Sequence, residues 1–253
     1  MLTDDEVPLH TSVSGAVYVV ALVTLNERSA CVPLIVDTGS TAILLPPSFT
    51  ATEALAAEAA AEALDVIDYM STSCGGTWLR GDVTIGRWAL AQVPVFLAVR
   101  APLDGSGMLG MSPRSALLST FGRLTLSLHS PARLSMSPLE RGHVTRTGVA
   151  TWSAAVASIS IAGRVIARDI VATIDSGSSH VICPRRAFQL FLTSRGARDI
   201  QLCMEDGLVV RVEAKLYHSD HDGWVLGIPF ILALRSLSFD ARRGELRLET
   251  LLE

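Results

Sequence analysis

The amino-acid sequence predicts an all-β protein with a few short helices, organised as two related halves. Short runs rich in β-branched residues, separated by glycine and proline, recur along most of the 253 residues, a pattern typical of many short strands. The signature Asp-Thr-Gly-Ser at 37–40 returns as Asp-Ser-Gly-Ser at 175–178, and each copy follows an apolar run. This repeat indicates two lobes, each of which brings an aspartate to the end of a buried strand.

Strands are expected in both halves. They cover residues 18–25, 83–85, 93–99, 155–161, 208–212 and 246–248. Residues 50–64 consist almost wholly of strong helix formers, mainly Ala, Glu and Leu, so we expect a partly exposed helix there. A shorter helix is expected at 185–192, directly after Pro184.

A change in composition separates the two halves. Between residues 130 and 147 the sequence turns to Ser, Pro, Arg and Gly with little periodicity, which predicts the connection between the lobes. We expect a first lobe at 1–135, a connection at 136–147 and a second lobe at 148–253. Each lobe is long enough for a hydrophobic core of its own.

Composition and charge exclude several classes of partner. Hydrophobic residues make up 49% of the chain, but no apolar run approaches the roughly 18 residues that a membrane span needs. A net charge of −4, without a basic patch, argues against nucleic-acid binding. The acidic start of the chain lacks the basic and apolar regions of a signal peptide. The sequence leaves open whether a targeting segment was removed or never existed.

The four cysteines do not form a metal or redox motif. Cys31, Cys74, Cys183 and Cys203 show no Cys-X-X-Cys spacing, which argues against a zinc site or a thioredoxin-type site. Two alternatives remain open: a disulfide between Cys183 and Cys203, or four small, buried thiols. We expect neither a metal nor a cofactor.

Other segments carry a family resemblance. They are Asp-Gly-Ser-Gly-Met-Leu-Gly-Met at 104–111, Trp152 with Ile-Ala-Gly at 161–163, Trp-Val-Leu-Gly-Ile-Pro-Phe at 224–230, and Phe239-Asp240. With the two aspartate signatures in register, the chain resembles the pepsin-like aspartic proteases over nearly its whole length. The resemblance implies the bilobal pepsin-like acid protease fold, with the active site between two lobes related by a pseudo-twofold axis.

The same resemblance implies a catalytic pair, Asp37 and Asp175. In aspartic proteases, two carboxyl groups that meet share one proton and activate a water molecule. Gly39 and Gly177 would allow the tight turns that bring the two loops face to face. The sequence does not indicate which aspartate carries the proton, because the titration belongs to the pair.

The resemblance also implies supporting roles for the polar residues of both signatures. Thr38 and Ser176 are expected to hydrogen-bond across the lobe interface and to hold the two carboxyl groups coplanar. Ser40 and Ser178 are expected to contact the outer carboxylate oxygens.

The flap departs from the family pattern. In the family, a hairpin of the first lobe carries a tyrosine that bonds a tryptophan shortly after the first signature. Leu44 stands at the tryptophan position, and segment 71–82, which resembles the Gly-rich hairpin, has Ser73 or Cys74 where tyrosine is usual. A shift of a few residues would make Tyr69 the flap aromatic, and Trp78 is the alternative. The expected flap and substrate-binding residues are Tyr69, Cys74, Gly75, Gly76, Thr77 and Trp78.

Two further groups of polar residues have less specific interpretations. Residues 218–222, His-Ser-Asp-His-Asp, are of metal-ligating types, but no helix spaces them, so a solvated loop is favoured. His180 stands where the family commonly has an apolar residue, and a partly buried histidine is favoured over a catalytic one.

We interpret the sequence as that of an aspartic-type endopeptidase, a hydrolase without a metal. Its expected partner is a polypeptide in extended conformation, with apolar residues around the scissile bond, as the resemblance implies. We expect a monomer, since one chain supplies both halves of the site, and the resemblance favours a secreted or acidic location. Two alternatives stay open. One is a weakly catalytic binding or inhibitory protein on the same scaffold, and the other is a precursor-processing protease of narrow specificity.

Overall fold

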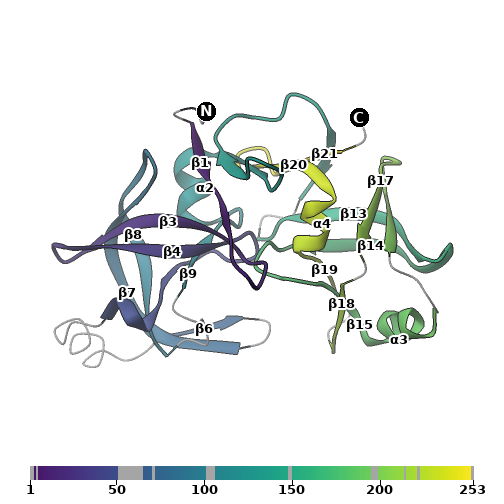
Figure 1. Ribbon diagram of the computed structural model, residues 1–253, viewed down its shortest axis with the longest axis horizontal. Helices are drawn as coiled ribbons and strands as arrows, with labels where there is room; N and C mark the ends of the chain where they lie inside the picture. The colour runs from purple at the N-terminus through teal and green to yellow at the C-terminus, as the bar shows by residue number, and fades with distance from the viewer. Residues whose placement is uncertain are drawn as a thin grey trace.

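The computed structural model describes residues 3, 5–50, 65–69, 72–100, 106–147, 150–194, 199–213, 215–220 and 223–251. Strands dominate this part of the chain and form three sheets (Figure 1). The mostly β, two-lobed architecture that the sequence predicts is confirmed.

The first lobe is built on an eight-stranded sheet. In spatial order its strands are β2 (His10–Thr11), β3 (Val17–Leu25), β4 (Arg28–Asp37), β9 (Gly107–Gly110), β5 (Ile43–Leu45), β8 (Trp88–Arg100), β7 (Thr72–Ile85) and β6 (Asp65–Tyr69). Strand β3 shows why these residues form strands, because every second side chain from Val17 to Leu25 is buried, as one face of a sheet requires.

The second lobe is built on a seven-stranded sheet. Its order is β17 (Val209–Glu213), β16 (Asp199–Met204), β13 (Ser153–Ile161), β14 (Arg164–Ile174), β19 (Trp224–Leu226), β15 (Val181–Pro184) and β18 (Leu216–Ser219). Figure 1 shows this sheet at the opposite end of the molecule from the eight-stranded sheet.

A six-stranded sheet joins the two lobes. It contains β1 (Glu6–Pro8), β11 (Arg133–Ser135), β10 (Arg123–Ser127), β20 (Leu234–Asp240), β21 (Glu245–Thr250) and β12 (His143–Arg146). Strands from the beginning, middle and end of the chain therefore lie in one sheet. Segment 130–147, which the sequence marks as a connection, contributes β11 and β12 to it.

Helices are few and short. Within the described residues they are the 3-10 helix η1 (Pro47–Thr50) and the α-helices α2 (Ala116–Phe121), α3 (Arg185–Thr193) and α4 (Ile228–Leu232). The expected helix at 185–192 is confirmed as α3, whereas the helix expected at 50–64 lies almost wholly outside the described residues. No helix in the described part of the chain is both long and apolar enough to cross a membrane.

Strand pairing repeats in the two lobes. In the first lobe β4 runs parallel to β9, and β5 returns antiparallel to β9. In the second lobe β14 runs parallel to β19, and β15 returns antiparallel to β19. The loops after β4 and β14 therefore have equivalent positions, and these loops carry the two aspartate signatures.

Cys183 and Cys203 do not form a disulfide. Both residues carry free thiols, Cys183 being buried and Cys203 half-buried. Burial raises the pKa of the Cys183 thiol to about 11, so this side chain behaves as a small apolar residue. Of the two alternatives that the sequence leaves open, the disulfide is therefore ruled out.

Candidate active site

The two signature aspartates are presented by buried strands. Asp37 is the last residue of β4, and Asp175 directly follows β14. The preceding residues, Val36 and Ile174, are fully buried, so the strand ends are fixed by the cores of their lobes. Asp37 itself is only 6% exposed, and Asp175 is half-buried.

The two loops meet face to face. A Cβ atom placed on Gly39 would lie 2.9 Å from Oδ1 of Asp175 and 3.3 Å from Oδ1 of Asp37. A Cβ atom on Gly177 would lie 2.8 Å from Cγ of Asp37. Both positions require glycine because each loop packs directly against the carboxyl group of the other. The structure thus brings Asp37 and Asp175 together.

Reciprocal hydrogen bonds hold the loops in this arrangement. The backbone N–H of Thr38 donates to Oγ of Ser176 (3.0 Å), and the N–H of Ser176 donates to Oγ1 of Thr38 (2.9 Å). The Thr38 hydroxyl also donates to the carbonyl of Ile174 (3.0 Å), and the Ser176 hydroxyl donates to that of Val36 (2.7 Å). Both side chains are buried, so these bonds lie in a region shielded from water.

Each carboxyl group also accepts a hydrogen bond within its own loop. The N–H of Gly39 donates to Oδ1 of Asp37 (2.8 Å), and the N–H of Gly177 donates to Oδ1 of Asp175 (2.9 Å). These equivalent bonds fix both side chains in matching orientations.

The environment favours the protonated form of Asp37. Burial, the charge of Asp175 and a hydrogen bond with the Asp175 carboxyl group together raise the pKa of Asp37 well above its ordinary value. The backbone N–H groups of Gly39 and Ser40 oppose this shift but do not cancel it. The pair can therefore hold a proton at a pH where an isolated aspartate is ionised.

The hydroxyls of the two signature serines bond within their own loops. Oγ of Ser40 accepts a hydrogen bond from the N–H of Ala42 (3.3 Å). The hydroxyl of Ser178 donates to the carbonyl of His180 (3.0 Å). Ser40 reaches the Asp37 carboxyl group through its backbone N–H, whereas the described hydrogen bonds of the Ser178 hydroxyl include none to a carboxylate oxygen.

Gly110 and Gly227 allow the signature loops to pack against neighbouring backbone. In the sequence they stand out only as parts of the segments that carry the family resemblance. A Cβ atom on Gly110 would lie 2.7 Å from the carbonyl oxygen of Ser40, and one on Gly227 would lie 2.4 Å from that of Ser178. Each glycine therefore lets its strand pass beneath the signature loop of the same lobe. Two apolar residues precede each of these glycines, Met-Leu at 108–109 and Val-Leu at 225–226. This repeat in the sequence marks the two glycines as equivalent, but it does not show that they contact the signature loops.

A hairpin overlaps the segment in which the flap is expected but begins earlier in the chain. Strands β6 and β7 pair antiparallel, with Ile67 opposite Cys74 and Tyr69 opposite Thr72. The prediction that the hairpin lies within 71–82 is wrong, since residues 72–85 form the single strand β7. Tyr69 therefore ends the first strand of the hairpin, and its side chain lies outside the described part of the structure.

Leu44 belongs to a small apolar cluster under this hairpin. This cluster is separate from the main hydrophobic core. It consists of Leu44, Cys74, Phe96, Ala98 and Met108, and Ile67 packs against it. Trp78 meets the Phe96 ring edge-on at 5.1 Å between centroids and stays 41% exposed. Thr77 is buried on the other face of β7, while Gly76 touches the Phe96 ring. Apolar packing thus occupies the position that the family gives to a tryptophan.

The remaining polar candidates are dispersed. His218 lies in β18, and Asp220 pairs with Arg185 at 3.1 Å, while His221 and Asp222 are outside the described residues. Within the described ranges no three metal-ligating side chains gather into a metal site. His180 is exposed rather than partly buried.

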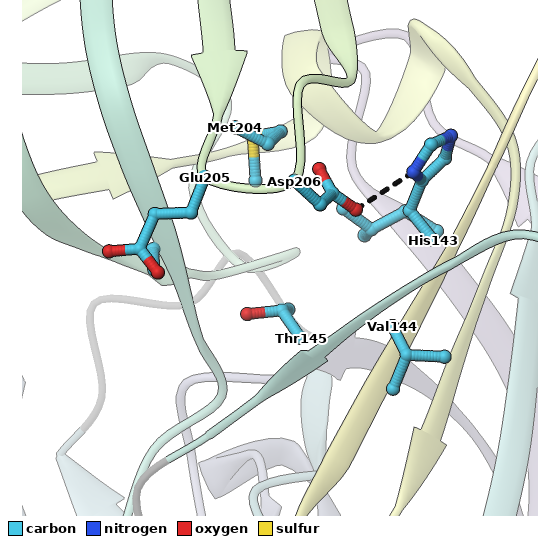
Figure 2. A pocket seen from close by; sticks show the side chains of 8 residues that line it. His143, Val144, Thr145, Met204, Glu205 and Asp206 are labelled. Carbon is cyan, nitrogen blue, oxygen red and sulfur yellow. Dashed lines mark hydrogen bonds and ion pairs between the residues drawn. The ribbon is translucent and has the colours of Figure 1, made fainter.

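Two cavities among the described residues do not contain the signature aspartates. One cavity of about 450 Å³ lies between the six-stranded sheet and the second-lobe sheet, and Figure 2 shows it with the His143–Asp206 contact of 2.8 Å at its side. Its lining contains none of the residues that the sequence predicts to be functional. The candidate active site is therefore the pair Asp37 and Asp175, and neither cavity is part of it.

Comparison with known proteins identifies the architecture. The structure matches a solved aspartic proteinase from Irpex lacteus with a TM-score of 0.76, over 97% of this chain and 96% of that chain, at 16% sequence identity. This is the bilobal aspartic proteinase fold. No family model matches the sequence, and no curated protein matches it significantly. The likeness shows the fold, and the roles of individual residues depend on the geometry described above.

Proposed function

We propose that this protein is an aspartic-type endopeptidase whose catalytic residues are Asp37 and Asp175. The observation that carries the proposal is the direct approach of two carboxyl groups on equivalent loops, together with the raised pKa of Asp37. Two carboxyl groups in direct contact cannot both lose their protons easily. This is the known condition for acid–base catalysis in aspartic proteases.

The mechanism requires one proton on the pair. The ionised carboxyl group takes a proton from a water molecule as that water attacks the peptide carbonyl, while the protonated group donates to the developing oxyanion. The Thr38–Ser176 bonds keep the two groups aligned during this exchange. The proton is a property of the pair, so neither aspartate is assigned as the permanent acid.

The substrate in this proposal is a polypeptide that lies extended across the dyad, between the lobes. The hairpin β6–β7 would cover it, with Tyr69, Gly75 and Trp78 as candidate contacts. Cys74, Gly76 and Thr77 are buried and would support the hairpin through packing. The enzyme would act as a monomer, with lobes at 1–135 and 148–253, because one chain supplies both loops.

Hydrolysis of a peptide library between pH 3 and 7 tests the proposal. We expect cleavage with an acidic optimum, inhibition by a statine-containing peptide, and loss of cleavage in both Asp37→Asn and Asp175→Asn. Asp199→Asn, which changes an exposed aspartate at the start of β16, is the matched control and should retain activity. Full activity in either dyad variant would refute the mechanism. Statine binding without any cleavage would favour the alternative of a binding protein, for which the altered surroundings of Leu44 are the supporting observation.

A further inference from the structure

Two basic residues, His180 and Lys215, have their backbones beside the second signature loop. The carbonyl of His180 accepts the Ser178 hydroxyl, and the same carbonyl lies 2.2 Å from the position of a Cβ atom on Gly227. The residue before Gly227, Leu226, accepts the N–H of Asp175 (3.1 Å). The backbone of His180 is therefore folded against the strand end that carries Asp175.

Lys215, the single lysine of the chain, is the neighbour of His180. The N–H of Val181 donates to the carbonyl of Lys215 (2.9 Å), which places the first residues of β15 next to the start of β18. Strands β15 and β18 run parallel from this point. Figure 1 shows both strands on the part of the second lobe that is turned toward the first lobe.

The side chain of His180 is available to a ligand. It is exposed, and its Nδ1 lies 2.9 Å from Oγ of Ser179. The ring packs against Tyr217, at 6.0 Å between centroids, and Tyr217 is itself 58% exposed. Among the described residues nothing hydrogen-bonds Nε2 of His180, so an orientated ring presents a second nitrogen to solvent.

Ionisable groups of both signs surround His180. The carboxyl groups of Asp175, on its own loop, and of Asp37, which faces that loop, are the acidic groups nearest in the fold. On the other elements that pack around it, the ionisable side chains are those of Cys183, Arg185, Arg186, Glu213, Lys215, Tyr217, His218 and Asp220. Lys215 lies 3.4 Å from Glu213, and Arg185 pairs with Asp220. Both ion pairs are mostly exposed and therefore weak, so an acidic ligand can compete for the two bases.

We propose that His180 and Lys215 form a subsite for an acidic side chain of the substrate. The inference rests on the proposed peptidase function and adds a substrate class to it. That class is peptides with Glu or Asp near the scissile bond, at the position that His180 and Lys215 contact. The Nε2 of His180 can donate a hydrogen bond to a carboxylate when it carries the ring proton, and Lys215 supplies a positive charge beside it. His180 lies five positions after Asp175, which limits the acidic position to within about four substrate residues of the scissile bond.

Statine-centred peptides that differ only by Glu or Gln test this subsite without requiring turnover. The Glu is moved through each of the four positions on either side of the statine, and the Kd is measured by fluorescence anisotropy at pH 5, where a peptide glutamate is largely ionised. At one position we expect the Glu peptide to bind about fivefold to tenfold more tightly than its Gln partner. The preference should decrease at pH 3, as the glutamate of the peptide becomes protonated.

Variants assign the preference to the two side chains. His180→Gln and Lys215→Gln should each reduce the Glu-to-Gln ratio, and the double variant should bring it close to one. His143→Gln is the matched control, because it alters another partly exposed histidine next to a carboxylate, in the cavity of Figure 2. It should keep the ratio of the unmodified protein.

The outcomes separate the subsite from the proposed function. Equal Kd values for all Glu and Gln pairs, or a ratio that survives in the double variant, would overturn the subsite even if peptides are cleaved. A ratio that depends on His180 and Lys215 supports the subsite even if no peptide is cleaved. Failure of every statine peptide to bind would overturn both.

Discussion

Thr38 and Ser176 donate their backbone N–H groups to each other's side-chain oxygens, at 3.0 and 2.9 Å, across the contact between the two lobes. Each hydroxyl then donates to a carbonyl of the strand that leads into the opposite signature. Four hydrogen bonds therefore link the two signature segments, and two of them join Thr38 directly to Ser176, 138 positions away. This contact holds the two lobes together at the point where Asp37 and Asp175 meet, so damage to it should affect both stability and the arrangement of the two carboxyl groups.

Removal of one hydroxyl from this contact should reduce stability and activity together. In Ser176→Ala, the N–H of Thr38 and the carbonyl of Val36 lose their buried partner, at a cost of about 1–3 kcal/mol in the free energy of unfolding. Chemical denaturation and peptide hydrolysis would measure the two effects. Ser119→Ala, at an exposed position on α2, is the control and should change neither. A Ser176→Ala variant with normal stability would show that water replaces the lost hydroxyl.

The signature loops could be predicted from sequence because their chemistry is local. A buried strand, an aspartate and a glycine occur within a few residues, and the repeat in the second half indicates that the two copies meet. The partners of Ser40 and Ser178 could not be predicted in this way. Their hydroxyls bond Ala42 and His180, and this choice depends on how each loop turns after the signature.

The flap could not be placed from sequence because glycine has two structural uses. Gly75 and Gly76 suggested the turn of a hairpin, since glycine is common in turns. In the structure both lie within β7, and Gly76 serves to admit the Phe96 ring rather than to form a turn. Phe96 is far along the chain, so only the fold reveals this contact. The sequence pattern does not predict strand β6 either, because Asp65 and Asp68 interrupt its apolar residues.

The neighbouring glycines Gly75 and Gly76 should therefore respond differently to alanine. A Cβ atom on Gly76 would lie 2.3 Å from the carbonyl oxygen of Leu97 and 2.6 Å from the Phe96 ring, whereas one on Gly75 would meet nothing within 4 Å. We expect Gly76→Ala to destabilise the protein by about 1–3 kcal/mol through overpacking. Gly75→Ala should leave stability within about 0.5 kcal/mol of the unmodified protein. Similar melting temperatures for the two variants would contradict the described register of β7 and β8.

Loss of the Asp37 carboxyl group should increase stability at neutral pH while it abolishes cleavage. Because the pKa of Asp37 is raised on folding, the folded protein binds this proton more strongly than the unfolded chain does. The stability of the unmodified protein consequently falls as the pH rises from the ordinary aspartate range, about 3.9, through the raised pKa. Asparagine does not titrate, so Asp37→Asn escapes this loss.

Thermal unfolding of Asp37→Asn at several pH values measures this effect. At pH 7 its melting temperature should exceed that of the unmodified protein by about 2–4 °C, the shift that 1 kcal/mol produces in a chain of this size. The advantage should shrink toward pH 3, where Asp37 is protonated in both states. Asp199→Asn again serves as the exposed control. A variant that is less stable at every pH would show that the carboxyl group is needed for packing rather than strained by its neighbour.

The opposite pH dependence is expected at Asp240, which ends β20. Burial alone would raise the pKa of Asp240, but hydrogen bonds from Arg123 and from the N–H of Arg243, with the charge of Arg123, outweigh it and lower the pKa. Nε of Arg123 lies 2.8 Å from Oδ2 of Asp240, and the two residues face each other between β10 and β20. The interaction therefore ties neighbouring strands of the sheet that joins the lobes.

Asp240→Asn should lose stability mainly at neutral pH. A carboxyl group with a lowered pKa stabilises the fold above its unfolded-state pKa, and this contribution disappears as the pH falls through the folded-state pKa. We expect a loss of about 1–3 kcal/mol at pH 6, since Arg123 and two backbone N–H groups lose an ionised acceptor. The difference from the unmodified protein should narrow as the pH is lowered below about 3.9.

Arg243→Gln is the matched control for this interaction, because its exposed side chain lies 4.0 Å from Glu245, a distance at which a surface pair contributes about 0.5 kcal/mol or less. Urea denaturation of all three proteins between pH 3 and 6 would compare them directly. If the Asp240→Asn difference stayed constant over this range, the carboxyl group would act through its shape and hydrogen bonds rather than its charge. The sheet that joins the lobes would then keep its stability at acidic pH without depending on the ionisation of Asp240.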